Sequence, residues 1–375
     1  MRILHVITSL DRGGAEAHLV DLIQRQLRAG HMVACAYLKG QGGWASTLEA
    51  AGAQVHPLSL RAYGDPGPVV RLRRLARDFA PEVAHLHLQP AEFYGAVAFA
   101  GADRPARVVS RHNLGRFYKG PAPQSLERWA VAKADRVIAI SEAAAGRVRE
   151  ASPRYPAKRL QVVPYGVDLT PYTRDPGPAR DRLRSGWGLA PGVFVFGTVS
   201  RLIESKRVDV LIDALASLRS ERPGIDARLV VVGDGPARVG LEARAREQGL
   251  DDAVTFAGLR SDVPDCLAAF DAFAFASVTE GFGLVLLEAM AARLPVIATA
   301  IPPMTDIVRD GETGLTAPVG DPAANARAMG RLLDDPGLAA RLSAAARACA
   351  EAHGLDVMAA RIEAIYREAL AERRA

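Results

Sequence analysis

The chain has 375 residues, of which 49% are hydrophobic and 24% charged. This composition excludes an intrinsically disordered chain and predicts two globular domains at roughly 100–200 residues each. The net charge of +5 conceals a strong asymmetry: residues 1–188 contain 27 Lys and Arg against 16 Asp and Glu (+11), whereas residues 189–375 contain 20 against 26 (−6).

Three cysteines lie far apart, at positions 35, 266 and 349. Their odd number and wide spacing argue against a disulfide framework and a Cys-x-x-Cys metal site, and favour a reducing compartment. The first ten residues lack a signal-peptide cleavage site, and no apolar run reaches the roughly 20 residues of a membrane span. We therefore expect a cytoplasmic protein, either free or peripheral on the inner face of the plasma membrane.

Short apolar runs alternate with amphipathic segments along most of the chain, which is typical of buried parallel strands joined by crossover helices. In the first half we expect helices over residues 15–29 and 68–79, and strands over residues 3–8, 32–38, 54–58, 83–88, 107–111, 136–141 and 160–164. A proline-rich polar segment at residues 164–178 then predicts an interdomain linker without long regular structure.

The pattern starts again after this linker. We expect helices over residues 207–220, 237–248 and 284–292, strands over residues 193–200, 227–233, 254–256, 272–276, 296–299 and 314–317, and only helices from residue 321 onward. The predicted fold class is therefore α/β, with two doubly wound Rossmann-like domains and a helical C-terminal tail. Such sheets bind ligands at the carboxyl ends of their strands, so we expect the two domains to face each other across one cleft.

Two basic residues follow the first predicted strand of the second half. Arg201 lies at the strand end, and Lys206 lies at the expected start of a helix. A guanidinium forks onto phosphate oxygens, an ammonium adds a point charge, and a helix N-terminus adds oriented N–H groups. The arrangement suits a diphosphate, and the alternative is that both residues are ordinary surface cations.

A second motif, from Thr279 to Glu288, follows the strand predicted at residues 272–276 and opens a helix. Gly281 and Gly283 allow a ligand to approach the backbone closely and leave N–H groups free at the helix start. Glu288 falls on a largely apolar helix, where a carboxylate needs a hydrogen-bonding partner. The alternative is that Glu280 is only a helix cap and Glu288 a solvated helix residue.

Glycine-containing turns occur at two further strand ends. Gly13 and Gly14 follow the first strand, and Gly233-Asp234-Gly235-Pro236 follows the strand at residues 227–233. Neither turn completes Gly-x-Gly-x-x-Gly or carries a Walker lysine, which excludes a dinucleotide fingerprint and a P-loop. Their N–H groups can still contact an anion, although such sequences commonly form plain turns.

Together these residues resemble the retaining nucleotide-sugar glycosyltransferases of family 4, which have the GT-B fold. The motifs that carry the resemblance are, in order, Arg201 with Lys206, the Gly-Asp-Gly-Pro turn, and Glu280-Gly-Phe-Gly followed by Glu288. The resemblance implies an acceptor-binding domain at residues 1–170, a donor-binding domain at residues 171–355, and a C-terminal helix at about residues 356–375 that packs back on the first domain.

The resemblance also implies a donor site. Arg201 and Lys206 would bind the diphosphate and stabilise the leaving nucleoside diphosphate, and Glu288 would accept hydrogen bonds from the ribose. Glu280 would face the donor sugar as a positioning and electrostatic group rather than a nucleophile. The remaining implied contacts are the backbone of Gly281, Phe282, Gly283 and Leu284 for the sugar and phosphate, the surroundings of Gly233, Leu259 and Arg260 for the base, and Gly13 and Gly14 from the other domain.

The implied catalytic residues are His112, Glu280, Arg201 and Lys206, where His112 matches the family's acceptor-side histidine near the reacting centre. The sequence contains no Asp-x-Asp. We therefore expect no metal or other cofactor, and fixed cations and helix dipoles would stabilise the departing phosphate. The resemblance favours front-face attack through an oxocarbenium-like state, with the leaving phosphate helping to deprotonate the acceptor.

One departure from the family is visible. The chain has Pro164-Tyr165-Gly166-Val167-Asp168 where the family often has Pro-Asn-Gly-Val-Asp. At an interdomain crossover this change is expected to matter little to the chemistry. His85 and His87 alternate on a predicted buried strand, and we expect packing for one and proximity to the acceptor for the other.

The basic first half suggests an anionic partner. Arg71, Arg73, Arg74 and Arg77 form a basic amphipathic stretch, and residues 116–119 mix aromatic and cationic side chains near His112. Such surfaces bind anionic lipid headgroups, which predicts contact with a membrane surface; the alternative is a solvated helix face. Nucleic acid is not expected, because no recognition motif accompanies the charge.

The leading hypothesis is transfer of a hexose or related sugar from a nucleotide diphosphate donor to a glycan or lipid-linked acceptor, in the synthesis of cell-surface polysaccharide, lipopolysaccharide or glycolipid. A nucleotide-sugar 2-epimerase of the same fold and a non-catalytic sugar-nucleotide-binding protein are the alternatives. The second alternative is disfavoured because Glu280, Arg201 and Lys206 are all present.

Overall fold

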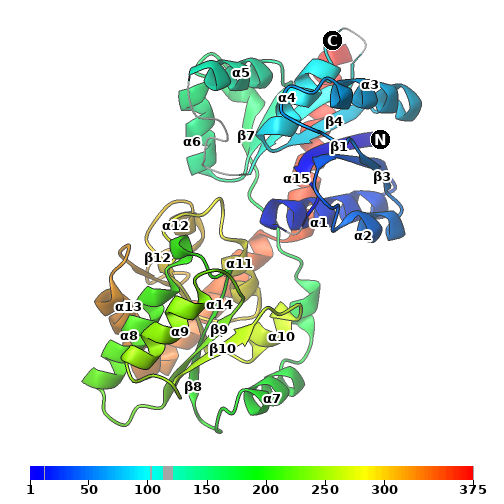
Figure 1. Ribbon diagram of the computed structural model, residues 1–375. Helices are drawn as coiled ribbons and strands as arrows, with labels where there is room; N and C mark the ends of the chain where they lie inside the picture. Colours follow the sequence, from blue (N-terminus) through cyan, green and yellow to red (C-terminus); the bar gives the residue numbers. More distant parts are fainter. Residues whose placement is uncertain (12, 102–103, 113–120, 375) are drawn as a thin grey trace. The chain divides into compact units, whose positions relative to one another are not determined.

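The computed structural model describes residues 1–11, 13–101, 104–112 and 121–374 (Figure 1). The chain divides into two compact units. The first unit comprises Met1–Gly166 with Leu355–Ala375, and the second unit comprises Val167–Gly354. The boundary predicted after residue 170 therefore lies a few residues inside the second unit.

The first unit is built on a seven-stranded parallel sheet with the order β3-β2-β1-β4-β5-β6-β7. Its strands are β1 (Arg2–Ser9), β2 (Met32–Lys39), β3 (Gln54–Pro57), β4 (Val83–His87), β5 (Ala106–Arg111), β6 (Arg136–Ala139) and β7 (Leu160–Val162). The helices are α1 (Gly14–Arg28), α2 (Ala45–Ala50), α3 (Gly67–Phe79), α4 (Gln89–Ala98), α5 (Pro121–Ala132) and α6 (Glu142–Ala151), with a 3₁₀ turn at Ala157–Arg159.

Both faces of this sheet are covered, which explains why its central strands read as continuous apolar runs. Successive residues of β1 point to opposite faces: Leu4 and Val6 join one core cluster, whereas Ile3 and Ile7 join clusters other than that one. All four side chains are fully buried. The alternation of faces along each strand fixes the register of the sheet.

The second unit contains a six-stranded parallel sheet with the order β10-β9-β8-β11-β12-β13. Its strands are β8 (Phe194–Val199), β9 (Ala227–Val232), β10 (Val254–Gly258), β11 (Ala272–Phe275), β12 (Val296–Thr299) and β13 (Leu315–Ala317). The helices are α7 (Gly177–Gly186), α8 (Val208–Glu221), α9 (Arg238–Glu247), α10 (Val263–Ala268), α11 (Leu284–Ala291), α12 (Met304–Ile307), α13 (Pro322–Asp334) and α14 (Pro336–Ala352). Two doubly wound sheets of this kind confirm the predicted fold class.

The predicted linker is shorter than expected. The segment forms a 3₁₀ turn at Thr170–Thr173, and α7 begins at Gly177 inside the proline-rich stretch. Pro178 is tolerated there because the first turn of a helix has no intrahelical acceptor for its backbone nitrogen. The prolines therefore mark the start of a helix as well as the break between domains.

The apolar face of α3 packs against the sheet of the first unit. Leu72, Leu75 and Phe79 are buried in the same core cluster as the strands. Packing thus explains the amphipathic pattern of the basic stretch, and the apolar face of α3 is not available for insertion into a bilayer. No helix in the described part of the chain combines the length and the hydropathy that a membrane crossing requires.

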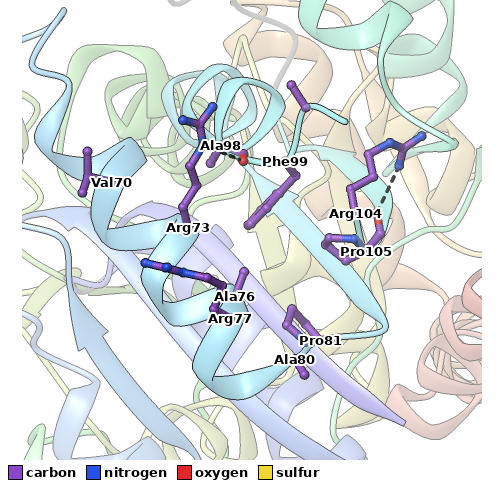
Figure 2. Close-up of a pocket in the computed structure, with 11 residues that line it drawn as sticks. Val70, Arg73, Ala76, Arg77, Ala80, Pro81, Ala98, Phe99, Arg104 and Pro105 are labelled. Atoms are coloured by element: carbon purple, nitrogen blue, oxygen red, sulfur yellow. Dashed lines mark hydrogen bonds between the residues drawn. The ribbon is translucent and has the colours of Figure 1, made fainter. Parts of the chain in front are cut away.

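The four arginines of α3 have different environments. Arg71 donates at 2.8 Å to a carbonyl of the loop after β3, and Arg73 donates at 3.1 and 3.2 Å to the last carbonyls of α4. Arg74 and Arg77 are exposed and form no ion pair with any described residue. Arg73, Arg77 and Arg104 line an open pocket of about 730 Å³ beside α3 (Figure 2). Only part of the predicted basic face is therefore free of a structural role.

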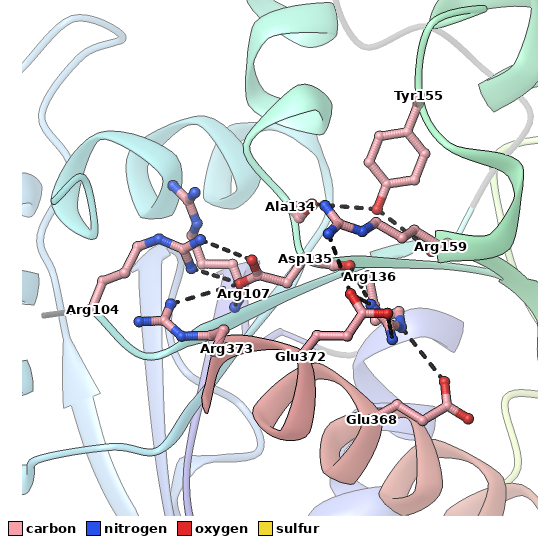
Figure 3. A network of polar contacts seen from close by, with 10 residues as sticks. All are labelled: Arg104, Arg107, Ala134, Asp135, Arg136, Tyr155, Arg159, Glu368, Glu372 and Arg373. Atoms are coloured by element: carbon pink, nitrogen blue, oxygen red, sulfur yellow. Dashed lines mark hydrogen bonds and ion pairs between the residues drawn. The ribbon is translucent and has the colours of Figure 1, made fainter. Parts of the chain in front are cut away.

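The C-terminal helix α15 (Leu355–Arg374) belongs to the first unit. One face of α15, from Leu355 through Ile362 to Ala369, packs in the core cluster that includes residues of β1, β4, β5 and β6. At its far end, Glu372 accepts two hydrogen bonds from Arg136, at 2.8 and 3.0 Å (Figure 3). An apolar stripe and a charged clamp thus hold the last helix on this sheet.

Candidate active site

The predicted donor residues gather where the order of the second sheet reverses. β8 and β11 are neighbours, but the chain leaves them in opposite directions across the sheet. In doubly wound sheets such a reversal is the place where ligands bind, at the carboxyl ends of the strands. Arg201 and Lys206 follow β8 and Glu280 follows β11, so the three residues flank this point.

Lys206 and Glu280 form an ion pair between Nζ and Oε1. The two side chains are 19% and 12% exposed, and Nζ lies 5.4 Å from the ring centroid of Phe275, the last residue of β11. A pair that is largely but not fully removed from water keeps strong electrostatic fields while remaining accessible to a ligand. The pair therefore places a positive and a negative charge side by side at the strand ends.

The backbone holds the two loops of this ion pair together. The carbonyl of Ser205 accepts hydrogen bonds from the backbone N–H of Val278 at 2.9 Å and from the hydroxyl of Ser277 at 3.2 Å. Ser277 is fully buried. The relative position of Lys206 and Glu280 is thus set by rigid backbone contacts rather than by two flexible side chains.

Arg201 is exposed in the loop after β8. Its guanidinium makes no hydrogen bond or ion pair to any residue that the structure describes. All of its donors therefore remain available for a bidentate contact to phosphate oxygens.

The Gly-Asp-Gly-Pro turn contacts the loop that carries Arg201. Gly233 has a φ of +129°, and a Cβ at this position would lie 1.8 Å from the carbonyl oxygen of Ser200. The backbone N–H of Leu202 also donates to the carbonyl of Asp234 at 2.9 Å. Gly233 is therefore required for close approach of two backbone segments, which is the plain structural role that the sequence left open.

The residues predicted to lie near the base follow β10. The N–H of Gly233 donates to the carbonyl of Gly258 at 2.8 Å, so Leu259 and Arg260 begin beside the Gly-Asp-Gly-Pro turn. Leu259 is 82% exposed. Arg260 donates to Asp262 at 2.6 and 2.8 Å, and this hydrogen-bonded carboxylate raises the pKa of Arg260. The structure thus brings the residues predicted to lie near the base to the same edge of the sheet as Arg201.

The second motif opens α11 as predicted. Gly283 is the N-cap with a φ of +86° and provides no capping side chain, so the suggestion that Glu280 is this helix's cap is wrong. Phe282 is buried, and Glu288 is half-buried one turn into the helix. Burial raises the pKa of Tyr172, and the negative charges of Glu288 and Asp168 raise it further, which places Glu288 in an environment shared with Tyr172.

The first sheet reverses between β1 and β4. Gly13 and Gly14 follow β1, and α1 begins at Gly14, so these glycines lie at the carboxyl edge as expected. Gly13 has an extended backbone, with a φ of −159°, that any residue can adopt. A role of the two glycines in donor binding stays a prediction.

His112 follows β5 and is only 7% exposed. Its Nε2 lies 2.9 Å from Nδ1 of His87, and its Nδ1 lies 2.6 Å from the hydroxyl of Tyr165. Both ring nitrogens are therefore engaged within the first unit. The predicted aromatic and cationic segment at residues 116–119 lies outside the described residues.

Tyr165 and His18 lie around the predicted site residue His112, and the sequence reasoning did not include either of them. The ring of His18, on α1, stacks on Tyr165 with centroids 4.0 Å apart. Tyr165 occupies the position where the sequence departs from the family, and it contacts His112, which was predicted to lie on the acceptor side. The tyrosine at position 165, where the family often has asparagine, was the one feature of the sequence that could have drawn attention to this contact.

His85 and His87 are both fully buried, together with His5 of β1. Nitrogens of these three histidines lie within 4.8 Å of one another, a spacing that a metal ion could use. Burial lowers the pKa of His5 to about 4 and that of His112 to about 3, and it lowers the pKa of His85 and His87 well below the usual value. All four rings are therefore neutral at pH 7.

Two family profiles together match most of the chain. Residues 12–171 match the family profile described as Glycosyltransferase Family 4, and residues 179–348 match the profile described as Glycosyl transferases group 1. D-inositol 3-phosphate glycosyltransferase from Salinispora arenicola is 37% identical over 72% of this chain and 60% of its own length. Alpha-D-kanosaminyltransferase from Streptomyces kanamyceticus is 32% identical over 70% of this chain and 68% of its own length. The chain thus spans about 60% of the length of the first of these relatives.

A solved structure is also similar. Anabaena Alr3699/HepE in complex with UDP-glucose is 26% identical, with a TM-score of 0.83 over 98% of this chain and 100% of that chain.

Proposed function

Because the chain belongs to the family 4 glycosyltransferases of the GT-B fold, we propose that it is a retaining, metal-independent hexosyltransferase. It transfers a sugar from a nucleotide diphosphate donor to a glycan or lipid-linked acceptor. The resulting product belongs to a cell-surface polysaccharide, lipopolysaccharide or glycolipid.

The observation that carries the proposal is the Lys206–Glu280 pair at the reversal of the second sheet. When the bond between sugar and diphosphate breaks, negative charge develops on the leaving phosphate and positive charge on the sugar ring. Lys206 and Arg201, which has no ion-pair partner among the described residues, provide fixed positive charge for the phosphate. Glu280 provides negative charge for the oxocarbenium-like sugar. Glu280 serves to orient the donor and to supply this charge, without forming a covalent intermediate.

The other donor contacts follow from the same edge of the sheet. Glu288 accepts hydrogen bonds from the ribose, and the N-terminus of α11 directs N–H groups toward the sugar and phosphate. Leu259 and Arg260 lie beside the base. The complex of HepE with UDP-glucose supports a nucleotide-sugar donor and makes UDP-glucose the first donor to test.

The first unit supplies the acceptor side, with His112 near the reacting centre. Arg74 and Arg77 are exposed cations on α3, and they support electrostatic contact with an anionic membrane surface that carries the acceptor. Because α3 uses its apolar face in the core, this contact depends on charge alone.

The test is release of nucleoside diphosphate from UDP-, GDP- and ADP-sugars, measured first without an acceptor and then with lipid-linked and glycan acceptors. Acceptor-dependent release with one donor is the expected result. Release of a free sugar whose 2-position is inverted, without any acceptor, would instead identify a 2-epimerase. Tight nucleotide binding without turnover of any donor would identify a non-catalytic binding protein.

A further inference from the structure

A continuous chain of hydrogen bonds runs through the buried interior of the first unit, from Tyr165 to Ser110, and includes His112. Its members come from three strands, from the segments that follow β5 and β7, and from α1 and α15. In order, we define the histidine chain as Tyr165, His112, His87, His5, Gln26, Tyr366, His85 and Ser110, with successive contacts of 2.6, 2.9, 3.0, 2.8, 3.3, 2.6 and 2.7 Å. All eight residues are buried.

The direction of one link determines the direction of the next. A neutral imidazole has one N–H donor and one acceptor nitrogen, so a ring that accepts at one nitrogen must donate from the other. Oε1 of Gln26 faces Nε2 of His5, which makes Nε2 of His5 the donor. Nδ1 of His5 must then accept from Nε2 of His87, and Nδ1 of His87 must accept from Nε2 of His112.

The same rule applies on the other side of Gln26. Its amide nitrogen donates to the hydroxyl of Tyr366, which in turn donates to Nδ1 of His85. Nε2 of His85 then donates to the hydroxyl of Ser110. With the amide of Gln26 in this orientation, all four histidines of the chain carry their proton on Nε2. Rotating the amide of Gln26 by half a turn would invert all four tautomers together.

We propose that Gln26 and Tyr366 are positioning residues that fix the tautomer and ring orientation of His112 through the histidine chain. This inference rests on the proposed function, because His112 is placed at the acceptor side by that function. The consequence is chemical: Nε2 of His112 donates into the protein and Nδ1 accepts from Tyr165, so His112 orients its surroundings and does not act as the general base. Tyr366 lies on α15, so the C-terminal helix determines the state of a residue at the end of β5.

The geometry favours the chain over a metal site. Each of His5, His85 and His87 uses both ring nitrogens in a hydrogen bond with a neighbour of the chain. A metal ion at these nitrogens would break several of these bonds in a fully buried place. The hydrogen-bond chain satisfies the same atoms without an ion.

The first test needs no substrate. Long-range ¹H–¹⁵N spectra of the full chain labelled on histidine side chains, assigned by single histidine substitutions, report which ring nitrogen carries the proton. At pH 7 we expect His5, His85, His87 and His112 to be neutral and to share the Nε2–H tautomer. Four rings that do not share one tautomer, or one equivalent of tightly bound zinc in the purified protein, would overturn the proposal.

The second test asks whether α15 controls His112. Tyr366→Phe removes the hydroxyl between Gln26 and His85, and we expect the ring signals of His112 and His85 both to move toward averaged tautomers. We also expect kcat to fall several-fold with an unchanged KM for the donor. Tyr155→Phe is the matched control, because among the described residues the Tyr155 hydroxyl donates only to the carbonyls of Ala134 and Arg159, in the same unit.

The proposed control of His112 by α15 would be rejected if Tyr366→Phe changed the signals of His85 alone. In that case His112 would keep its wild-type tautomer and the enzyme its wild-type kcat. If no donor is turned over by the wild-type protein, the proposed function fails. The tautomer spectra still decide the histidine chain in that case, so the two failures are distinguishable.

Discussion

The hydroxyl of Tyr165 lies 2.6 Å from Nδ1 of His112, so a residue of the crossover after β7 determines one hydrogen bond at the end of β5. The ring of Tyr165 also stacks on His18. This single side chain thereby joins three segments of the first unit at the predicted acceptor side.

We expect Tyr165→Phe to lower kcat about 2- to 10-fold, because one hydrogen bond of about 0.5–1.5 kcal/mol is lost while the stacking on His18 is kept. Steady-state kinetics with saturating donor would measure the change. Tyr155→Phe serves again as the control. An unchanged kcat would show that the hydroxyl has no part in the reaction.

We expect Lys206→Ala to lower kcat/KM for the donor at least about 100-fold, because it removes a fixed positive charge at the leaving phosphate. We also expect some loss of stability, measured by thermal unfolding, because the substitution leaves the largely buried Glu280 without its ion-pair partner. Arg244→Ala is a matched control in the same unit, as it breaks an ion pair with Asp213 between two helices. Comparable kinetic losses in both variants would contradict the assigned role of Lys206.

We expect Gly233→Ala to destabilise the second unit by at least about 2 kcal/mol, because the new Cβ collides with the carbonyl of Ser200 at a positive φ. Gly240→Ala is the control: it lies in α9 with nothing within 4 Å of the added Cβ. This control should be neutral or stabilising by about 0.5–1 kcal/mol. Denaturant unfolding of both variants would compare them directly, and equal stabilities would refute the close-approach argument.

The buried histidines make the first unit sensitive to acid. Burial lowers the pKa of His5 from 6.5 to about 4 and that of His112 to about 3, and it lowers the pKa of His18, His85 and His87 as well. The unfolded chain therefore binds more protons below pH 6.5, so stability is full above pH 6.5 and is lost as the pH falls toward 4. At one pH unit below 6.5, each such histidine lowers the free energy of unfolding by about 1 kcal/mol.

Melting temperatures at pH 7.5 and pH 5.5 would measure the loss of stability. Hydrogen exchange at the same two pH values would show which unit loses protection. We expect the first unit to lose protection at pH 5.5 well before the second unit does. If lowering the pH reduced the hydrogen-exchange protection of both units equally, neutral burial of these rings would be contradicted.

We expect Arg74→Glu with Arg77→Glu to reduce binding to vesicles that contain anionic lipid, with no change in the melting temperature, because neither side chain has a described ion-pair partner. Arg71→Ala should instead lower the melting temperature, since Arg71 holds carbonyls of the loop after β3. Co-sedimentation at two salt concentrations would measure the binding. Unchanged binding of the double variant would leave α3 without a membrane role.

Local sequence patterns were enough to locate the strands and to identify the chemistry of the donor motifs. Buried parallel strands are continuous apolar runs, so β1, β8 and β11 could be located from local composition. Arg201, Lys206 and Glu280 could be found because each follows such a strand, and strand ends are where doubly wound sheets bind ligands. The linker was the weakest prediction, because proline both breaks helices and starts them.

The contacts between distant polar residues became visible in the folded chain alone. Tyr165, Tyr366 and Gln26 give no local signal of a contact with histidines, since the residues joined by a hydrogen bond are up to 340 positions apart. The sequence likewise predicts one basic face for the arginines of α3. In the structure, Arg71 and Arg73 donate hydrogen bonds to backbone carbonyls instead. Apolar periodicity is a property of residues that are neighbours in the sequence. The pairing of buried donors and acceptors depends instead on which segments the fold brings together.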